Sequence, residues 1–401
     1  MTPRPLRVAH VTEAFCGGVL TYVKTILPRL VGCGCDVSLI CSLKRQWQGM
    51  EQAVGELRRT GVTVHVVNMA RGVRPWTDAI SLARLTAILA RGRFDVVHTH
   101  GSKAGCLGRV AGRLAGAAVV AHTPHCFAFL RGSGEARNRL YHGMERALGR
   151  LTDVLVGVSA MEAQLARALG TIPARRCVVL ENPLEDLPRR DSDATKARRG
   201  LLAESFGIPP GRRVVTLAAR LVPYKGVGAF VRAAGMCRSP DAVFLIAGEG
   251  PLRGAVEETI ASLALADKVR LLGGVRDMDS LHDATDVAVS CSRAEGQSYA
   301  VLEAMRAGLA IVAADTEENR QLLRHGVSGW LVAPSPAYIA AAIDRLLADD
   351  KLRAALGAAS REAFRSRPAP DLQAQRLSEI YLACLNEPMR RTPCRERLIL
   401  A

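Results

Sequence analysis

Short hydrophobic runs alternate with longer amphipathic stretches along the first half of the chain. Six runs rich in valine, leucine, isoleucine and alanine stop at polar or turn residues, and we expect each to form a strand: 6–12, 36–42, 61–67, 93–100, 117–125 and 153–159. Stretches with helical periodicity separate these runs, as in the segment 19–34. Such alternation is typical of a parallel sheet that helices cover on both faces.

The same pattern begins again at residue 212 and predicts a second sheet. Its expected strands are 212–220, 241–250, 268–275, 286–292, 309–315 and 328–334, and the helical stretches 337–364 and 371–387 close the chain. We therefore expect an α/β protein with two Rossmann-like, doubly wound parallel-sheet domains, and a length of 401 residues agrees with two cores. The expected domains are 1–187 and 200–370, with 371–387 as a closing helix that packs back on the first. The polar segment 184–200 is the expected linker.

Composition favours a globular protein of the cytoplasm. Hydrophobic residues make up 49% of the chain and charged residues 23%, as in ordinary folded domains. We find neither an apolar run long enough to span a bilayer nor the features of a secretory signal at the N-terminus. The 11 cysteines are scattered, with Cys33 and Cys35 the closest pair, so we expect reduced, buried thiols and neither disulfides nor metal ligands.

Positive charge is concentrated in the first half of the chain. Residues 1–190 contain 26 Lys and Arg against 13 Asp and Glu, whereas the whole chain has 54 against 38. A basic half is typical of proteins that bind nucleic acid, anionic lipid or a phosphorylated substrate, although arginine on solvated faces is an equally ordinary explanation. An aromatic content of 4% disfavours stacking on single-stranded nucleic acid. We therefore expect an anionic membrane surface as a partner and no nucleic acid.

Loops that directly follow strands are the candidate binding loops, because open parallel sheets bind ligands beyond the carboxyl ends of their strands. Arg220 and Lys225 share the loop after 212–220. Two cations on one loop suit a diphosphate, arginine through its planar fork and lysine as a point charge. Gly248 and Gly250 follow the next strand, where backbone without side chains can approach a flat ring such as a nucleobase.

The first domain offers three further loops of this kind. Gly17 and Gly18 lie between a strand and a helix, where backbone amides favour phosphate, although a plain tight turn has the same signature. Their spacing differs from Gly-x-Gly-x-x-Gly, so a redox dinucleotide is disfavoured. His125 follows a strand and can hydrogen-bond a substrate hydroxyl, although a structural histidine is the simpler reading. Lys103, near a helix start, is another candidate phosphate ligand.

Two acids stand out in the stretch RAEGQSYAVLEAMRAG of the second domain. Glu295 lies in the loop after 286–292, and Glu303 lies within a helix that Ser298 is expected to cap and Gly308 to end. Carboxylates accept hydrogen bonds from sugar hydroxyls, and a helix N-terminus favours phosphate. The pair therefore suits a ligand that carries a sugar at each end of a diphosphate.

Taken in order, these motifs resemble the retaining glycosyltransferases of family 4, which have the GT-B fold. The resemblance extends to about Asn386, and its most specific part is the Glu-x7-Glu motif of Glu295 and Glu303 followed by AMRAG. It implies two domains that face a central cleft. It also implies transfer of a sugar, with a UDP-sugar as the favoured donor, to a glycan or lipid-linked acceptor with retention of configuration. Synthesis of cell-surface polysaccharide or glycoconjugate is the expected setting.

The resemblance also implies a role for each candidate residue. Arg220 and Lys225 would grip the donor diphosphate, Glu303 would hold the ribose and Glu295 the transferred sugar, with His125 beside that sugar. The implied catalytic residues are Glu295, His125, Arg220 and Lys225, and the implied donor-binding residues are Gly17, Gly18, Arg220, Lys225, Gly248, Gly250, Glu295 and Glu303. The nucleotide-sugar is a co-substrate, and no metal or other cofactor is expected. The Asp191/Asp193 and Asp277/Asp279 pairs are interpreted as solvated acids.

One segment departs from the family pattern, which leaves the donor sugar open. Where the family often has two glycines and later a glutamate, this chain has Glu317, Glu318 and Gln321. Carboxylates there would repel phosphate or bind particular sugar hydroxyls. Two alternatives remain at this point: a nucleotide-sugar epimerase or phosphorylase of the same fold, and a non-catalytic glycan-binding or nucleic-acid-binding protein.

Overall fold

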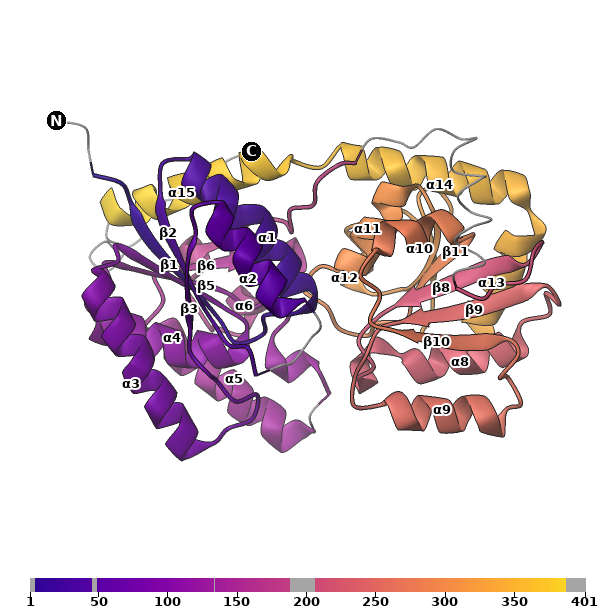
Figure 1. Cartoon of the computed structure of the whole chain (residues 1–401), viewed down its shortest axis with the longest axis horizontal. Coiled ribbons are helices and arrows are strands. Elements are labelled where there is room, and N and C mark those ends of the chain that lie inside the picture. The colour runs from indigo at the N-terminus through magenta and orange to yellow at the C-terminus, as the bar shows by residue number, and fades with distance from the viewer. Residues whose placement is uncertain (1–3, 45–48, 133, 188–205, 387–401) are drawn as a thin grey trace. The chain divides into compact units, whose positions relative to one another are not determined.

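The computed structural model of the chain divides into two units (Figure 1), and it describes residues 4–44, 49–132, 134–187 and 206–386. The first unit comprises Met1–Glu185 and Pro368–Ala401, and the second comprises Asp186–Arg367. From residue 188 onward the expected linker lies outside the described residues.

The first unit is built on a seven-stranded sheet in the order β3-β2-β1-β4-β5-β6-β7, with every neighbouring pair parallel. Its strands are β1 (Arg7–Thr12), β2 (Asp36–Cys41), β3 (Thr63–Val66), β4 (Val96–His100), β5 (Val119–Thr123), β6 (Val154–Gly157) and β7 (Cys177–Val179). The six expected strands are confirmed, and β7 was not predicted. The strand order reverses between β1 and β4, the position at which such sheets bind ligands.

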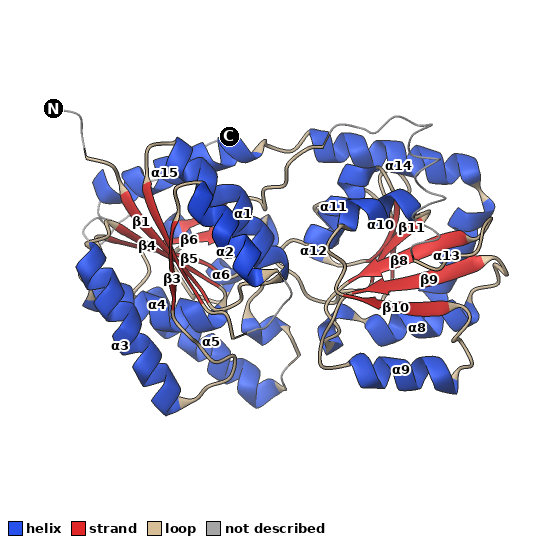
Figure 2. Cartoon of the chain, in the orientation of Figure 1, coloured by secondary structure: helices blue, strands red, loops and turns tan. Residues whose placement is uncertain are grey.

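Helices cover both faces of this sheet (Figure 2). They are α1 (Gly17–Gly32), α2 (Met50–Arg59), α3 (Pro75–Gly92), α4 (Ser102–Leu114), α5 (Glu135–Gly149), α6 (Ala160–Ala168) and α15 (Pro370–Asn386), with short 3-10 turns η1 (Ala128–Leu130) and η2 (Ala174–Arg176). Because side chains alternate along a strand, Ala9 and Val11 of β1 join the core with α3 and α4. His10 between them therefore points to the opposite face. On that face α1 packs against α15, the last helix among the residues that the structure describes.

The second unit contains a six-stranded parallel sheet in the order β10-β9-β8-β11-β12-β13. Its strands are β8 (Arg213–Ala218), β9 (Ala242–Ala247), β10 (Val269–Gly273), β11 (Val287–Ser290), β12 (Ala310–Ala314) and β13 (Trp330–Val332). All six were expected from the sequence. The order reverses between β8 and β11, so the loops after these two strands lie at the usual ligand-binding position.

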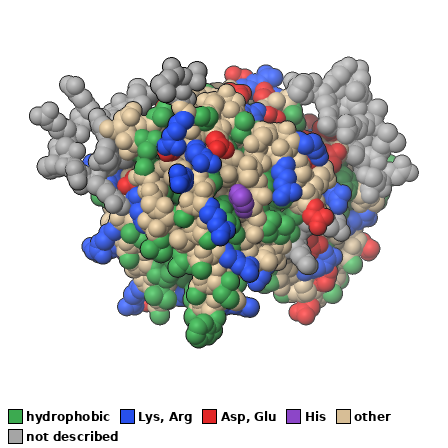
Figure 3. Space-filling model, turned by 60° about the vertical axis from the view of Figure 1, so that its left-hand side comes forward, with side chains coloured by type: hydrophobic (Ala, Val, Ile, Leu, Met, Phe, Trp, Pro, Cys, Tyr) green, Lys and Arg blue, Asp and Glu red, His purple; other side chains and the backbone are tan. Residues whose placement is uncertain are grey.

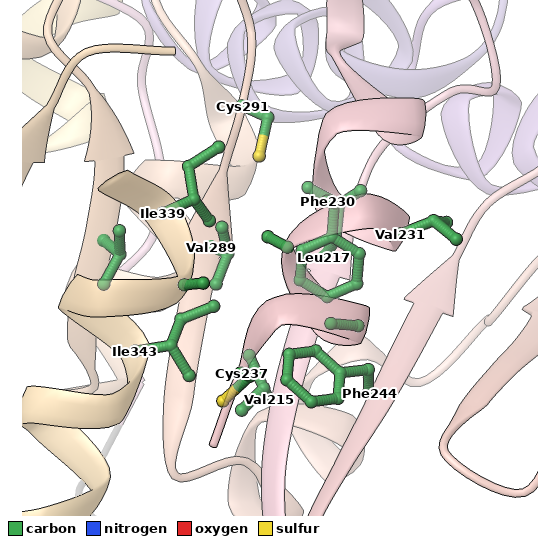
Figure 4. Close-up of a cluster of buried hydrophobic side chains, with 14 of the residues drawn as sticks. Val215, Leu217, Phe230, Val231, Cys237, Phe244, Val289, Cys291, Ile339 and Ile343 are labelled. Carbon is green, nitrogen blue, oxygen red and sulfur yellow. The ribbon is translucent and has the colours of Figure 1, made fainter. Parts of the chain in front are cut away.

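Helices also cover both faces of the second sheet. They are α8 (Val227–Met236), α9 (Arg253–Ser262), α10 (Met278–Ala284), α11 (Tyr299–Ala307), α12 (Glu317–Arg320), α13 (Pro336–Ala348) and α14 (Asp350–Arg365), with a 3-10 turn η3 (Pro223–Lys225). Leu217 of β8 packs with Phe230 of α8, Phe244 of β9 and Ile343 of α13 (Figure 4). The two phenylalanine rings meet edge to face, with their centroids 5.6 Å apart. The prediction of two doubly wound parallel sheets is confirmed.

Candidate active site

The loop after β8 carries two of the predicted diphosphate ligands. Arg220 follows the strand directly, and Lys225 ends η3 at the start of α8. Gly226 makes this turn possible, because its φ of +68° is left-handed and an added Cβ would lie 2.3 Å from the carbonyl oxygen of Cys291. The turn therefore packs closely on the chain that leaves β11.

The structure brings Lys225 and Glu295 together although 70 positions separate them. Their side chains form an ion pair, and each is 16% exposed. A backbone hydrogen bond of 2.8 Å from Arg293 N to Tyr224 O also joins the two loops. The pair thus lies after β8 and β11, the two strands at which the sheet order reverses. A cation and an acid that can hydrogen-bond a sugar are held side by side at the ligand-binding edge of this sheet.

Arg220 differs from the other cation of its loop because its charge is not compensated. Its side chain is half-buried and makes no hydrogen bond or ion pair with any residue that the structure describes. A partly desolvated guanidinium without an acid favours an incoming anion, and its fork suits phosphate oxygens. Arg220 is therefore available to a diphosphate.

Gly248 and Gly250 fit the loop after β9 against the Arg220 loop. A Cβ on Gly248, whose φ is +148°, would lie 1.9 Å from Ala219 O. A Cβ on Gly250 would lie 2.5 Å from Leu221 O. Backbone packing within the protein is therefore one reason for these glycines. Contact with a nucleobase stays a prediction.

Glu303 lies on α11 and is half-buried. Burial raises the pKa of this carboxyl to about 7, and the neighbouring Arg306 opposes that rise. No hydrogen bond or ion pair joins Glu303 to any other described residue, so its oxygens remain available to a ligand. Gly308 ends the helix with a φ of +71°, as expected. Ser298 occupies the N-cap position of the helix, as expected, but its side chain makes no capping hydrogen bond.

The unusual acids after β12 lie in two different environments. Glu317 is exposed at the start of α12, whereas Glu318 is only 8% exposed. A Glu318 carboxylate oxygen lies 3.4 Å from the backbone nitrogen of Glu295. Glu318 is thus adjacent to the Glu295 loop, and Gln321 is half-buried just beyond α12. Any ligand held by Glu295 would lie near a second buried carboxylate.

The aspartate pairs have structural roles where the structure describes them. Asp277 caps α10 by accepting a 3.0 Å hydrogen bond from Ser280 N, and Asp279 forms an ion pair with Arg306 of α11. Asp277 is nevertheless exposed and the Asp279 side chain is 35% exposed, in agreement with their interpretation as solvated acids. Asp191 and Asp193 lie outside the described residues.

In the first unit, the predicted glycine pair opens a helix. Gly17 and Gly18 are the first residues of α1, and Gly17 has a φ of +55°. Cys16 provides no side-chain cap, and the first turn contains no acid. The first backbone amides of α1 therefore suit an anion. Lys103, the other predicted phosphate ligand of this unit, is less suited to an anion, because its charge is largely buried in a 2.7 Å ion pair with Asp78.

His125 lies in a strained loop after β5. His125 and Cys126 have φ values of +49° and +77°, a conformation that costs residues other than glycine about 1–3 kcal/mol each. Cys126 N donates a 2.7 Å hydrogen bond to Glu162 of α6, and Arg131 donates one of 2.8 Å to Cys126 O. Glu162 is fully buried, and burial raises the pKa of its carboxyl to about 7. These contacts hold a backbone shape that the chain would otherwise avoid.

The ring of His125 is held from two sides. Its Nε2 lies 3.1 Å from Nδ1 of His100, and the ring of Tyr22 meets it edge to face at 5.0 Å between centroids. Burial lowers the pKa of His125 to about 3, with a smaller contribution from Arg131, so the ring is neutral at physiological pH. Sequence reasoning missed Glu162, Arg131 and His100. Only His100 had a signal, the alternation of His98 and His100 on one face of β4.

Both units match known families. Residues 17–183 match the family described as "Glycosyl transferase 4-like domain", and residues 199–363 match "Glycosyl transferases group 1". The D-inositol 3-phosphate glycosyltransferase of Acidothermus cellulolyticus is 31% identical over 384 residues, which cover 88% of this chain and 82% of that protein. The chain belongs to the glycosyl transferases group 1 family. The predicted glycosyltransferase class is thereby confirmed.

Other relatives and solved structures agree with this assignment. The UDP-Gal:alpha-D-GlcNAc-diphosphoundecaprenol alpha-1,3-galactosyltransferase of Escherichia coli is 29% identical over 273 residues, 67% of this chain and 70% of that protein. Anabaena Alr3699/HepE in complex with UDP-glucose superposes with a TM-score of 0.79 at 18% identity and covers 94% of this chain and 99% of its own. WaaG, a glycosyltransferase involved in lipopolysaccharide biosynthesis, superposes with a TM-score of 0.72 at 16% identity and covers 93% of this chain and 99% of its own. These structures support the fold, and the predicted GT-B class is confirmed.

Proposed function

We propose that the protein transfers a sugar from a nucleotide-sugar, with a UDP-sugar as the favoured donor, to a glycan or lipid-linked acceptor with retention of configuration. The observation that carries this proposal is the pair of loops after β8 and β11. They hold an uncompensated arginine, Arg220, and a lysine–carboxylate pair, Lys225 and Glu295, where the sheet order reverses. Diphosphate and sugar are the groups that such side chains bind.

In this proposal, transfer breaks the bond between the sugar C1 and the donor phosphate oxygen and joins C1 to the acceptor hydroxyl oxygen, whose proton passes to the leaving diphosphate. Negative charge develops on the leaving nucleoside diphosphate. Arg220 and Lys225 stabilise that charge, so no metal is needed for it. Glu295 accepts hydrogen bonds from the transferred sugar, and Glu303, a half-buried acid without a partner in the described chain, binds the ribose hydroxyls.

The choice of UDP follows the relatives. The name of the Escherichia coli galactosyltransferase includes UDP-Gal as donor and a diphosphoundecaprenol acceptor, and Anabaena Alr3699/HepE was solved with UDP-glucose. An acceptor carried on a lipid diphosphate, in the synthesis of a surface polysaccharide or glycoconjugate, is the corresponding proposal for this chain. Gly17 and Gly18, at the uncapped start of α1, are proposed anion ligands of the first unit.

An activity panel tests the reaction. The protein is incubated with UDP-, GDP- or ADP-sugars, with and without a polyprenyl-diphosphate-linked sugar, and nucleotide release and glycan products are followed. Proton NMR of the product gives its anomeric configuration. We expect an acceptor-dependent product with the donor's configuration, and its loss in Lys225→Ala. Conversion of donor to an epimer without acceptor, or an inverted product, would contradict the proposal.

We also propose that the protein acts at the cytoplasmic face of an anionic membrane. None of the helices in the described part of the chain is long and apolar enough to cross a bilayer. At the start of α3, however, Val73, Trp76 and Ile80 are 70%, 86% and 56% exposed, beside the exposed Arg71 and Arg74. Figure 3 shows Lys and Arg side chains interspersed with hydrophobic ones on the face in view. Tryptophan favours the membrane interface, and each nearby cation adds about 1 kcal/mol on anionic lipid.

Vesicle sedimentation tests the membrane proposal separately from catalysis. We expect binding to vesicles with anionic lipid at low salt and a clear reduction in Trp76→Ser. The matched control is Tyr338→Ser, which removes another exposed aromatic, 62% exposed on α13. Equal binding by both variants, or none by the wild type, would refute this surface.

A further inference from the structure

A row of hydrogen-bonded side chains lies behind His125 in the first unit. They come from β1, β4, the end of β5, the loop after β5 and α15, and those on the strands lie on the sheet face opposite α4. We call this row the histidine chain, and in order it comprises Thr123, His98, Tyr381, His10, His100 and His125. All but His125 are nearly inaccessible to solvent.

Every link in the row is short enough for a hydrogen bond. Nε2 of His98 lies 2.8 Å from the hydroxyl of Thr123, and its Nδ1 lies 2.5 Å from the hydroxyl of Tyr381. The same tyrosine hydroxyl lies 3.5 Å from Nε2 of His10, the longest link. Nδ1 of His10 lies 2.9 Å from Nε2 of His100, and Nδ1 of His100 lies 3.1 Å from Nε2 of His125. The row therefore connects α15, at the end of the chain, with the candidate catalytic histidine.

The row is unsuited to a metal ion, although nitrogens of His10, His98 and His100 lie within 4.8 Å of one another. A metal lies in the plane of each imidazole that binds it. The ring of His100 instead stacks on those of His10 and His98, with interplanar angles of 12° and 25°. Both nitrogens of His98 also have protein partners. Hydrogen bonding accounts for this geometry better than coordination does.

All four histidines are neutral at physiological pH. Burial lowers the pKa of His10 to about 3 and those of His98 and His100 well below their usual value. His125 was described above as neutral for the same reason. A neutral imidazole donates at one nitrogen and accepts at the other. In a continuous row whose tyrosine hydroxyl donates to one neighbour and accepts from the other, one choice of donor therefore fixes all the others.

Only two arrangements satisfy every link and also give the buried Tyr381 hydroxyl proton an acceptor within the row. In one, each of the four histidines carries its proton on Nδ1, the tyrosine donates to His10, and Thr123 donates to His98. In the other, each carries its proton on Nε2, and every donor direction reverses. Nδ1 of His125 has no hydrogen-bond partner among the described residues, so it can face a ligand. It presents a proton in the first arrangement and a lone pair in the second.

We propose that Tyr381 and the three histidines behind His125 are positioning residues, which fix the tautomer and ring orientation of the histidine that contacts the donor sugar. The contact with the sugar rests on the proposed function, whereas the coupled tautomers rest on the geometry alone. A helix at the end of the chain thereby controls a loop near residue 125.

Nitrogen-15 NMR of the histidine side chains tests the tautomers directly, without any substrate. We expect one shared tautomer for His10, His98, His100 and His125 in the wild type. Tyr381→Phe removes the central link. Because an unpartnered buried N–H is rarer than an unpartnered acceptor, we expect His98 in this variant to carry its proton on Nε2 and the other three on Nδ1.

The matched control is Tyr22→Phe, since the buried Tyr22 hydroxyl has no hydrogen-bond partner in the described chain. We expect that variant to leave the four NMR signals in the wild-type pattern. If Tyr381→Phe folds poorly, Thr123→Val tests the other end, because loss of the hydroxyl favours the arrangement with all protons on Nδ1.

Kinetics test the catalytic consequence. Outer partners of functional histidines at metal sites contribute about 10- to 100-fold, so we expect Tyr381→Phe to lower kcat about tenfold with the donor KM unchanged. Mixed tautomers in the wild type, one shared tautomer in Tyr381→Phe, or a stoichiometric bound metal that protects the histidines would overturn the proposal. So would an altered tautomer of His125 with an unchanged kcat. A wild type that transfers no sugar would instead refute the proposed function. The NMR result would still decide whether the tautomers of the histidine chain are coupled.

Discussion

The Lys225–Glu295 ion pair leads to a prediction that separates nucleotide binding from sugar transfer. Glu295 compensates the charge of Lys225, and both side chains are only 16% exposed. A diphosphate that binds Lys225 must therefore compete with this carboxylate and lie near its negative charge. Glu295→Gln keeps the size of the side chain and removes the competing charge.

The size of the effect follows from the electrostatics of a partly buried pair. Two unit charges 4 Å apart interact with about 4 kcal/mol near a protein surface and about 1 kcal/mol in water. With some solvent screening at 16% exposure and a longer distance to the diphosphate, we take about 1 kcal/mol. UDP should therefore bind Glu295→Gln about fivefold more tightly than wild type. Sugar transfer should fall about tenfold or more, since a charged hydrogen-bond acceptor at the sugar is lost.

Isothermal titration calorimetry with UDP and a nucleotide-release assay measure the two effects on one preparation. Glu257→Gln is the matched control, because it removes the same charge from an exposed ion pair on α9. Its UDP affinity and transfer rate should both match wild type within twofold. Unchanged or weaker UDP binding by a folded Glu295→Gln protein would show that this acid and the diphosphate do not share Lys225.

Three further predictions concern stability. Gly248→Ala should destabilise the protein by more than about 2 kcal/mol in urea unfolding, because the new Cβ would lie 1.9 Å from Ala219 O. The control is Gly254→Ala on α9, where no atom lies within 4 Å of the new Cβ, and this variant should be neutral or slightly more stable. Glu162→Gln should lower the free energy of unfolding by about 1–3 kcal/mol. The Glu162 carboxylate accepts hydrogen bonds from two backbone N–H groups, and in the variant one of them would face the amide NH₂ group; an unchanged urea midpoint would refute this. The urea midpoint should fall as pH drops below 6.5. The four histidines of the histidine chain have lowered pKa values in the folded protein, so the unfolded state binds more protons, and each histidine contributes about 1.4 kcal/mol per pH unit. The pKa values of Glu162 and Glu303 are raised to about 7, so their contribution to the stability of the folded protein falls as pH rises from 4.5 to 7. These two groups offset the effect of the four histidines only in part. A urea midpoint that stays constant from pH 6.5 to 5 would contradict the prediction.

The fold was largely predictable because its strands are buried on both faces. Twelve hydrophobic runs gave twelve strands, and the helix ending at Gly308 was placed by a glycine that adopts a positive φ. Strand β7 was missed, since three residues carry too little pattern to stand out from a loop. The 3-10 turn that ends at Lys225 likewise gave no separate signal.

The candidate site was predictable only where its residues follow strands. Arg220, Lys225 and Glu295 could be found because the ends of neighbouring parallel strands share one edge of the sheet. Side-chain partners that only tertiary packing brings together could not be predicted from the sequence. Nothing in the sequence links Lys103 to Asp78, or His98 to Tyr381, which lies 283 positions away.

The binding of UDP to Arg220 tests the central claim most directly, since this half-buried cation has no partner in the described structure. We predict that UDP binds the wild type and that Arg220→Ala weakens it about 10- to 100-fold, the value of a charged hydrogen bond. Arg238→Ala, which removes an exposed cation before β9 at the other edge of the sheet, should change the affinity less than about twofold. A wild type that binds no nucleoside diphosphate, or an Arg220→Ala protein that binds UDP as tightly, would contradict the assignment of this loop to the donor.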